Sequence, residues 1–265
     1  MFAIEIPYCD LNAIYFNHNQ HLRWTRVDAD KYIKINGKNI VLAYQKKNKK
    51  YFICNEEDFY NKWYDYFDIN HDYEESYFEL KKFVRQTKNK IVTMKANENA
   101  DIRLVKMDIF EAMIAYCLDE DIFTKQKMKY LSEFGNKRHN TLQGLSINWY
   151  EFPSPKQLYY ANHKFPIISK DEEERIRHIC KNAKLIRNTD TEDEEDVYTT
   201  LYSIYNNKEW IKRMMIYCFG FKNYFSIRDK DKALFKKINI SPKDFMGYKE
   251  KGLLLNYITG GNRWE

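Results

Sequence analysis

The stretch Tyr66-Phe-Asp-Ile-Asn-His-Asp-Tyr73 decides the fold, because two differently patterned regions of the chain meet there. Before it, residues 14–53 form short runs rich in β-branched and aromatic side chains, which turns such as Asn36-Gly37 separate. After it, apolar residues recur at helical spacing almost to the end of the chain. The pattern predicts an α+β protein with an N-terminal antiparallel β-sheet followed by helices.

Individual elements can be placed on these patterns. The strands expected are Lys31–Ile35, Asn39–Tyr44 and Lys50–Cys54, and Asn55-Glu-Glu is typical of a helix N-cap followed by acidic residues. The acidic run 189–196 is typical of a solvated loop that leads into a helix. The helices expected are Asp58–Tyr66, Tyr73–Gln86, Ile109–Leu118, Thr124–Phe134, Pro155–Ala161, Lys170–Leu185, Glu194–Tyr205, Glu209–Phe219, Lys230–Lys237 and Lys249–Ile258.

Length and composition indicate a folded, weakly basic protein. The chain has 265 residues, of which 44% are hydrophobic, and its formal net charge of +6 suits a polyanion partner without requiring one. Its five cysteines are scattered without metal-site spacing, so we expect no metal and no cofactor. Without a signal peptide or a membrane-spanning apolar run, we expect a cytoplasmic monomer. The many Tyr, Phe, Lys and Asn residues suggest an AT-rich bacterial or phage gene.

Several segments, in order along the chain, resemble the bacterial 8-oxoguanine DNA glycosylases. Tyr66–Tyr73 is similar to the family's Y-F-D-L-D-x-D-Y, which ends its β-domain, and this match is the most specific. The other matching segments are Asn19-Gln-His-Leu-Arg-Trp24, similar to G-Q-C-F-R-W; 102–114, similar to I-R-L-L-K-Q-E-P-F-E-x-x-I; 152–161, similar to F-P-T-x-x-x-L-x-x-A; and 175–183, at the place of the R-A-K-Y-I helix. The resemblance covers almost the whole chain.

The resemblance implies two domains. Residues 1–72 would form the antiparallel β-domain, and residues 73–265 would form a helical helix–hairpin–helix glycosylase-like domain with a degenerate hairpin near residues 201–213. A cleft between the helical halves would receive a base that is flipped out of the duplex, because the glycosidic carbon is unreachable inside the base stack.

The family's catalytic residues are missing from the matching positions. The family has L-x-G-V-G-x-K-V-A-D and, one helix later, F-P-V-D. An ungapped placement puts Tyr205 and Asn207 at the two glycines, Glu209 at the nucleophilic lysine and Arg228 at the aspartate. Both catalytic charges are therefore inverted, no catalytic residue is retained, and Glu209 and Arg228 can form an ion pair. Because asparagine tolerates positive φ, Asn206 and Asn207 permit the hairpin turn to persist.

A second departure points in the same direction. The family's S-x-N-N-N loop is replaced by Asp119-Glu-Asp-Ile-Phe123, whose three carboxylates oppose a phosphate backbone. We therefore expect a catalytically degenerate DNA-glycosylase-fold protein that binds DNA or a nucleic-acid-binding protein complex. The composition adds the hypothesis of a phage or mobile-element accessory that interferes with host defence, such as a CRISPR effector.

Two alternatives stay open. The first is an active DNA glycosylase that excises a damaged or hypermodified base, in DNA repair or anti-phage defence. Lys212 and Asp231 have the same separation as the inverted pair, and Asp229 offers water activation without a lysine. The second is a pure protein-interaction module, whose binding would respond less to salt than DNA binding does.

The expected nucleic-acid contacts gather around the hairpin. Most lysine clusters in such a chain are typical of solvated faces, but those flanking the hairpin are the best candidates for phosphate contacts. Arg23 can contact nucleic acid or form a cation–π packing pair with Trp24. The full set of expected contacts is Arg23, Asn206, Asn207, Lys208, Lys212, Arg213, Lys230 and Lys232.

Overall fold

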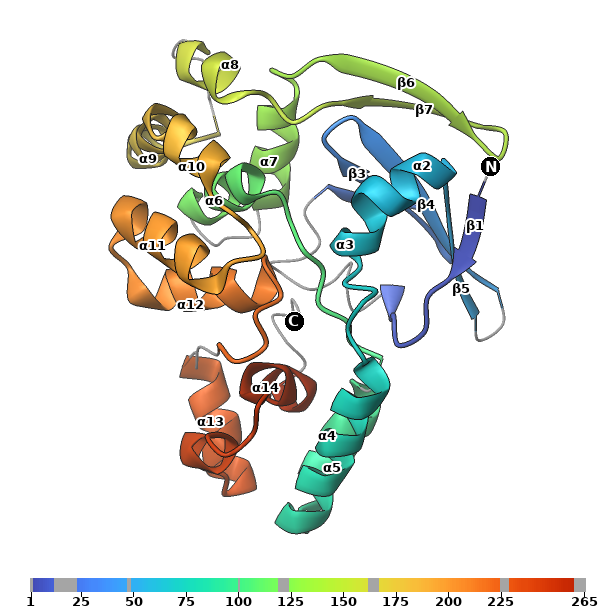
Figure 1. The fold of residues 1–265 in the computed structure, drawn as a ribbon, viewed down its shortest axis with the longest axis vertical. Coiled ribbons are helices and arrows are strands. Elements are labelled where there is room, and N and C mark those ends of the chain that lie inside the picture. Colours follow the sequence, from blue (N-terminus) through green and yellow to red (C-terminus); the bar gives the residue numbers. More distant parts are fainter. Residues whose placement is uncertain are drawn as a thin grey trace.

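The predicted fold class is confirmed. The computed structural model describes residues 2–11, 23–46, 49–99, 101–118, 124–161, 167–224 and 229–259. Over these ranges an N-terminal antiparallel sheet is followed by a large helical region (Figure 1). No helix within these ranges has the length and apolar character needed to cross a membrane.

The N-terminal sheet has five antiparallel strands in the order β1-β5-β4-β3-β2. The predicted Asn36-Gly37 turn joins β3 to β4, with Gly37 at a φ of +58°, which a glycine adopts without strain. The three predicted strands are present, and β1 and β2 were not predicted. The strands are β1 (Phe2–Glu5), β2 (Trp24–Asp28), β3 (Lys31–Asn36), β4 (Asn39–Lys46) and β5 (Lys49–Cys54).

One face of the sheet packs against a short aromatic helical segment. Asn55 caps its first turn by accepting a hydrogen bond from the amide of Glu57 at 3.0 Å, so the predicted N-cap is confirmed. The segment consists of α2 (Glu56–Asp58), the π-helical turn η1 (Phe59–Trp63) and α3 (Tyr64–Tyr66). Its aromatic side chains form one buried cluster with Trp24, Tyr32 and Phe52 of the sheet.

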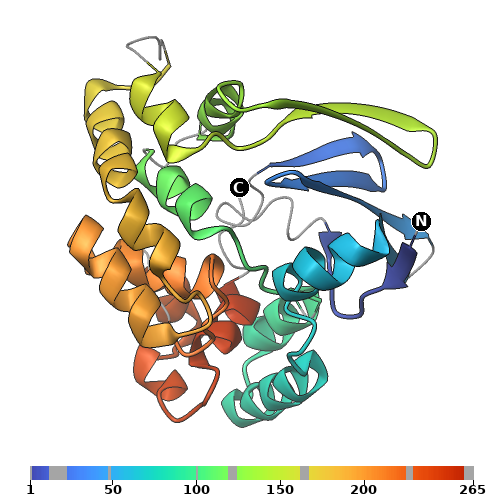
Figure 2. The same cartoon turned by 45° about the horizontal axis from the view of Figure 1, so that its top comes forward.

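The other face of the sheet is covered by a hairpin from much later in the chain. Strands β6 (Lys137–Leu142) and β7 (Leu145–Tyr150) arch over β3 and β4 (Figures 1 and 2). Leu142 and Trp149 pack there on the isoleucines and leucine of the sheet. The expectation of helices alone after residue 55 was therefore wrong. Gln143 and Gly144 both adopt positive φ, which suits a tight two-residue turn.

Each predicted helix overlaps a helix of the structure. Lys170–Leu185 is divided at Asn182, and α5 was not predicted. Because β6 and β7 pack on the sheet, the domain boundary at residue 72 stays a prediction. The remaining helices are α4 (Tyr73–Thr87), α5 (Lys90–Glu98), α6 (Ile109–Cys117), α7 (Thr124–Ser132), α8 (Pro155–Tyr160), α9 (Lys170–Lys181), α10 (Ala183–Asn188), α11 (Glu194–Tyr205), α12 (Lys208–Tyr217), α13 (Asp229–Ile238), the 3-10 turn η2 (Pro242–Phe245) and α14 (Lys251–Thr259).

The helical region has two buried clusters that share α12. In the first, α6 is buried along most of its length and packs with α7, α9, α11 and α12. The second gathers α4, α5, α13 and α14. Met214 and Met215 of α12 belong to the first cluster, whereas Ile216 and Tyr217 belong to the second. α12 therefore connects the two halves of the helical region.

A buried arginine joins the sheet to the helices. Arg103, in the extended segment before α6, is 3% exposed. Its Nη1 donates to the carbonyl oxygens of Phe67 at 2.7 Å and Asp68 at 3.0 Å, and its Nη2 donates to that of Pro7 at 3.0 Å. The guanidinium also lies 4.0 Å from the centroid of the Tyr73 ring. Segments far apart in the sequence are thus held at one point.

Arg103→Met should lower the free energy of unfolding by roughly 3 kcal/mol, because three buried carbonyl oxygens lose their donor. Urea-induced unfolding followed by tryptophan fluorescence measures this change. Arg85→Met, on the exposed side of α4, is the matched control and should change stability by less than about 0.5 kcal/mol. Equal effects of the two substitutions would contradict the assigned role of Arg103.

Candidate functional site

The residues expected to form the hairpin lie in the turn between α11 and α12. Asn206 ends α11 with a φ of +48°, a left-handed conformation that asparagine tolerates. Asn207 then caps α12, since its side-chain oxygen accepts hydrogen bonds from the amides of Glu209 and Trp210 at 3.2 Å each. The first free amides of α12 are therefore already engaged by the protein's own cap, and a phosphate would have to displace it.

The turn is fixed against α6. The Tyr205 hydroxyl donates a hydrogen bond to the carbonyl oxygen of Met113, and the Tyr205 and Trp210 rings meet edge to face with centroids 5.9 Å apart. Burial is the main reason why the pKa of the Tyr205 hydroxyl lies well above its ordinary value, so Tyr205 stays neutral. The exposed residues 206–209 therefore follow directly on a side chain that is anchored to α6.

Glu209, which the ungapped placement puts at the nucleophilic lysine, is an exposed carboxylate. Its Oε1 lies 3.0 Å from Nζ of Lys212, and the two side chains are 59% and 43% exposed. The pair joins Glu209 to the lysine that was the fallback nucleophile. Arg228 lies outside the described residues, so the predicted Glu209–Arg228 ion pair stays a prediction.

The other residues expected at the site are only partly described. Asp229, Lys230 and Asp231 form the first turn of α13. Lys208 and Lys232 are exposed. Arg213 is half-buried, with its guanidinium 5.9 Å from the ring centroid of Tyr116 on α6. The loop 119–123 lies outside the described ranges.

Arg23 is a buried packing residue, and its aromatic partner differs from the one expected. Its side chain is 5% exposed, its Nη1 lies 3.5 Å from Oε2 of Glu111, and it donates to the carbonyl oxygen of Tyr150. The guanidinium lies 5.9 Å from the ring of Phe152, whereas Trp24 packs edge to face on Phe67. The expected Arg23–Trp24 pair was therefore wrong. Burial favours the packing alternative for Arg23 over contact with nucleic acid.

A buried lysine beside this ion pair was missed by the sequence analysis. Lys34 on β3 is 2% exposed, and its Nζ lies 5.3 Å from the ring centroid of Tyr66. Burial lowers the pKa of Lys34 to about 8, while Glu111 opposes the shift and Arg23 adds to it. The alternation of β3 places Lys34 on the same face as Tyr32, but no local pattern in the sequence predicts a buried lysine there.

A cavity of about 560 Å³ opens between the sheet and the helices. The β3–β4 turn, the first turn of α6, residues 152–155 and α10 line it, and Lys38, Lys62 and Arg187 contribute positive charge. Thr189 and Thr191, which precede α11, also line it. The cavity therefore lies at the opposite end of α11 from the hairpin turn. The resemblance had implied a cleft between the helical halves instead.

Lys34→Met should stabilise the protein at pH 7, because a pKa lowered from 10.5 to about 8 means that folding opposes the protonated amine. This penalty is fully present below pH 8 and disappears as the pH rises towards 10.5. The stability gap between variant and wild type should therefore narrow by about 2 kcal/mol between pH 7 and 9.5.

Urea unfolding of both proteins at the two pH values tests this prediction. Lys31→Met, at an exposed position of the same strand, is the control and should leave the pH dependence unchanged. A gap that stays constant with pH would mean that Lys34 does not titrate in this window.

Comparison with known proteins gives a family match for the N-terminal part and a fold match for the whole chain. Residues 3–113 match the family model described as 8-oxoguanine DNA glycosylase, N-terminal domain. The apo structure of Clostridium acetobutylicum 8-oxoguanine glycosylase/lyase is similar, with a TM-score of 0.78, 16% identity and 98% of each chain covered. No curated protein sequence matches the chain.

Two further structures share the fold. The same Clostridium enzyme in complex with dsDNA containing cytosine opposite 8-oxoG gives a TM-score of 0.77 at 16% identity, covering 98% of this chain and 97% of that one. The 3-methyladenine DNA glycosylase from Archaeoglobus fulgidus gives 0.68 at 17% identity, covering 98% of each chain. The resemblance to the 8-oxoguanine DNA glycosylases is confirmed by the N-terminal match and by the fold.

Proposed function

We propose that this chain, which has the fold of the 8-oxoguanine DNA glycosylases and matches their N-terminal domain, binds DNA without excising a base. The observation that carries the proposal is Glu209. A carboxylate cannot form the covalent imine that a lysine amine forms with the sugar carbon. Its ion pair with Lys212 at 3.0 Å also engages the amine of the fallback nucleophile.

DNA as the partner is supported by the fold and by the charge. The similar Clostridium structure holds a DNA duplex. This chain carries a net charge of +6, and Asn206, Asn207 and Lys208 are exposed together at the tip of the hairpin. Lys212 and Arg213 follow on α12. Lysine and arginine side chains release counterions when they neutralise phosphates, which gives affinity without base recognition.

The base that an active relative would excise does not follow from the fold, because the similar Archaeoglobus protein is a 3-methyladenine glycosylase. The alternative of an active enzyme rests on Lys212 with Asp231 as the supporting acid, or on Asp229, which would activate water without a lysine. Lys212 stands one turn into α12, on its accessible side.

The proposed setting combines DNA binding with a role in a mobile element. The many Tyr, Phe, Lys and Asn residues suggest an AT-rich bacterial or phage gene. In that setting the protein would be an accessory that interferes with a component of host defence, such as a CRISPR effector. The partner is then DNA itself or a complex that holds nucleic acid. The cytoplasm and a monomeric state are part of the proposal, and the free cysteines, all buried, fit a reducing compartment.

The deciding experiment measures base release and binding in the same samples. Duplexes carrying 8-oxoguanine, uracil, 3-methyladenine or glucosylated hydroxymethylcytosine are incubated with the protein, and borohydride is added to trap an imine. We expect gel-shift binding without base release and without trapping. Released base would overturn the proposal, and loss of release in Lys212→Ala, Asp229→Asn or Asp231→Asn would then identify the residues of an active enzyme.

Removing two hairpin charges should weaken DNA binding. Lys208→Ala with Lys212→Ala should lower affinity about tenfold at physiological salt and reduce the slope of log affinity against log salt by about 2, because two phosphate contacts are lost. Lys82→Ala with Arg85→Ala, which removes two exposed charges from α4, is the matched control. Equal losses in both double variants would place the DNA elsewhere. Binding that does not respond to salt would indicate a protein partner.

A further inference from the structure

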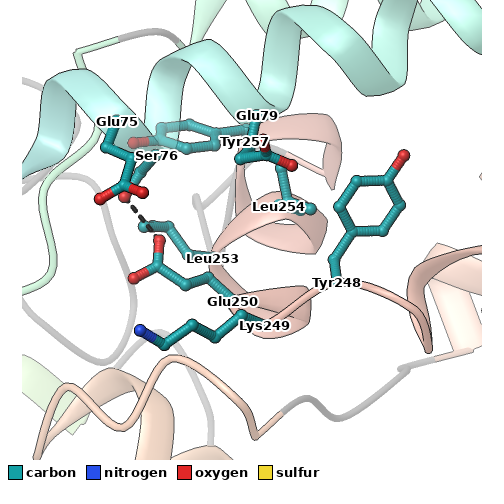
Figure 3. A pocket seen from close by; sticks show the side chains of 9 residues that line it. All are labelled: Glu75, Ser76, Glu79, Tyr248, Lys249, Glu250, Leu253, Leu254 and Tyr257. Carbon is teal, nitrogen blue, oxygen red and sulfur yellow. Dashed lines mark hydrogen bonds between the residues drawn. The ribbon is translucent and has the colours of Figure 1, made fainter.

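A second pocket lies between α4 and α14, and none of its lining residues belongs to the α11–α12 turn. It encloses about 170 Å³ and is lined from α4, from the loop before α14 and from α14 itself (Figure 3). This volume is well below the ~300–1,000 Å³ of pockets that hold drug-sized ligands, so its occupant must be small. Its lining residues are Glu75, Ser76, Glu79, Tyr248, Lys249, Glu250, Leu253, Leu254 and Tyr257.

The charge of the pocket is opposite to that of the chain. Glu75, Glu79 and Glu250 contribute three carboxylates against the single ammonium of Lys249 in the lining. Lys82 approaches Glu79 at 3.7 Å, but both side chains are about half exposed, so water screens that pair. A negative pocket in a chain of net charge +6 repels phosphate and favours a cation.

Glu250 is held in its ionised form by its neighbours. The Ser76 hydroxyl donates to its Oε2 at 2.5 Å, and Nε2 of His71 lies 3.3 Å from its Oε1 (Figure 3 shows the first of these contacts). Burial raises the pKa of Glu250, but the hydrogen bonds from His71 and Ser76, together with the charges of His71 and Lys222, outweigh burial and hold the pKa below its ordinary value. The inner wall of the pocket therefore carries a fixed negative charge.

A buried hydroxyl in the pocket wall lacks a partner. Tyr257 is 0% exposed and lines the cavity, and its hydroxyl makes no hydrogen bond with any residue that the structure describes. In Figure 3 its hydroxyl end lies on the side of Ser76 and Glu75. A buried polar atom without a partner destabilises the folded state, unless a ligand supplies the missing hydrogen bond.

We propose that this pocket binds the ammonium group of an alkylamine. An ammonium has three N–H donors and no acceptor, which matches carboxylate oxygens and the hydroxyl oxygen of Tyr257. Leu253 and Leu254 provide apolar surface for the methylenes. A metal ion fits less well, since no three His, Cys, Asp or Glu side chains among the described residues are grouped so that they could hold one. This inference does not depend on the proposed DNA binding.

The test titrates the full-length protein with 1,4-diaminobutane by isothermal calorimetry at low salt. We expect saturable binding at one site, and no binding of 1-butanol, which has the chain without the ammonium. Tyr257→Phe should weaken binding about fivefold and Glu79→Gln about tenfold, the usual effects of losing a neutral and a charged hydrogen-bond acceptor. Glu74→Gln, exposed on the same helix but outside the pocket, should bind as the wild type does.

The outcomes separate the proposal from its alternatives. Tyr257→Phe removes a hydroxyl that has no described partner, so the variant should fold, and its thermal unfolding checks this. No saturable binding at millimolar diamine, or equal weakening by Glu74→Gln and Glu79→Gln, would overturn the proposal. N-acetyl-lysine methylamide, titrated in the same way, tells the two sources of an alkylammonium apart: tighter binding than the diamine identifies a lysine side chain of a partner, and weaker binding identifies a free amine.

Discussion

The buried guanidinium of Arg103 is the contact on which the arrangement of sheet and helices depends. It brings together the carbonyl oxygens of Pro7, Phe67 and Asp68, which belong to the chain after β1 and to the turn before α4. The carboxylate of Asp68 in turn accepts a hydrogen bond from Lys222 at 2.6 Å, and Lys222 lies in the connection between α12 and α13. One hydrogen-bonded network thus fixes the end of α12 relative to the sheet, although α12 and the sheet lie more than a hundred residues apart in sequence.

The segments that resemble the glycosylases are largely those that hold this scaffold together. Tyr66 accepts a hydrogen bond from the Trp24 indole at 3.0 Å, and Glu111 pairs with Arg23 at 3.5 Å, so each contact joins two of the matching segments. The segment expected to form the hairpin is where the sequence departs from the family pattern. Glu209 stands there as an exposed carboxylate. Packing constrains a buried residue from every side, whereas few contacts constrain an exposed one. The division between resemblance and departure follows burial.

Local signals in the sequence predicted much of the fold, and contacts between distant residues account for most of what was missed. Asn55 and the acidic start of α11 act within one helical turn, so their roles could be inferred. The β6–β7 hairpin has a mostly exposed first strand, and what stabilises it is the sheet face it covers. Lys34 is buried because distant segments close over it, and the pocket at Tyr257 needs α4 and α14 to meet. For the candidate site, the sequence predicted a turn with positive φ, which Asn206 adopts, but it assigned Arg23 the wrong aromatic partner. The role of Glu209 stays a prediction.

The β6–β7 hairpin, which covers one face of the sheet, also determines when that face can be buried during synthesis. The ribosome releases the five strands first, and their outer face exposes Ile33, Ile40, Leu42 and Ile53 until residue 150 has emerged. For the time needed to translate about a hundred residues, roughly 5–20 s at ~5–20 residues per second, that apolar surface has no cover from its own chain. A nascent chain in this state is a substrate for chaperones and a hazard for aggregation. The sheet can reach its final form only after much of the helical region has been made.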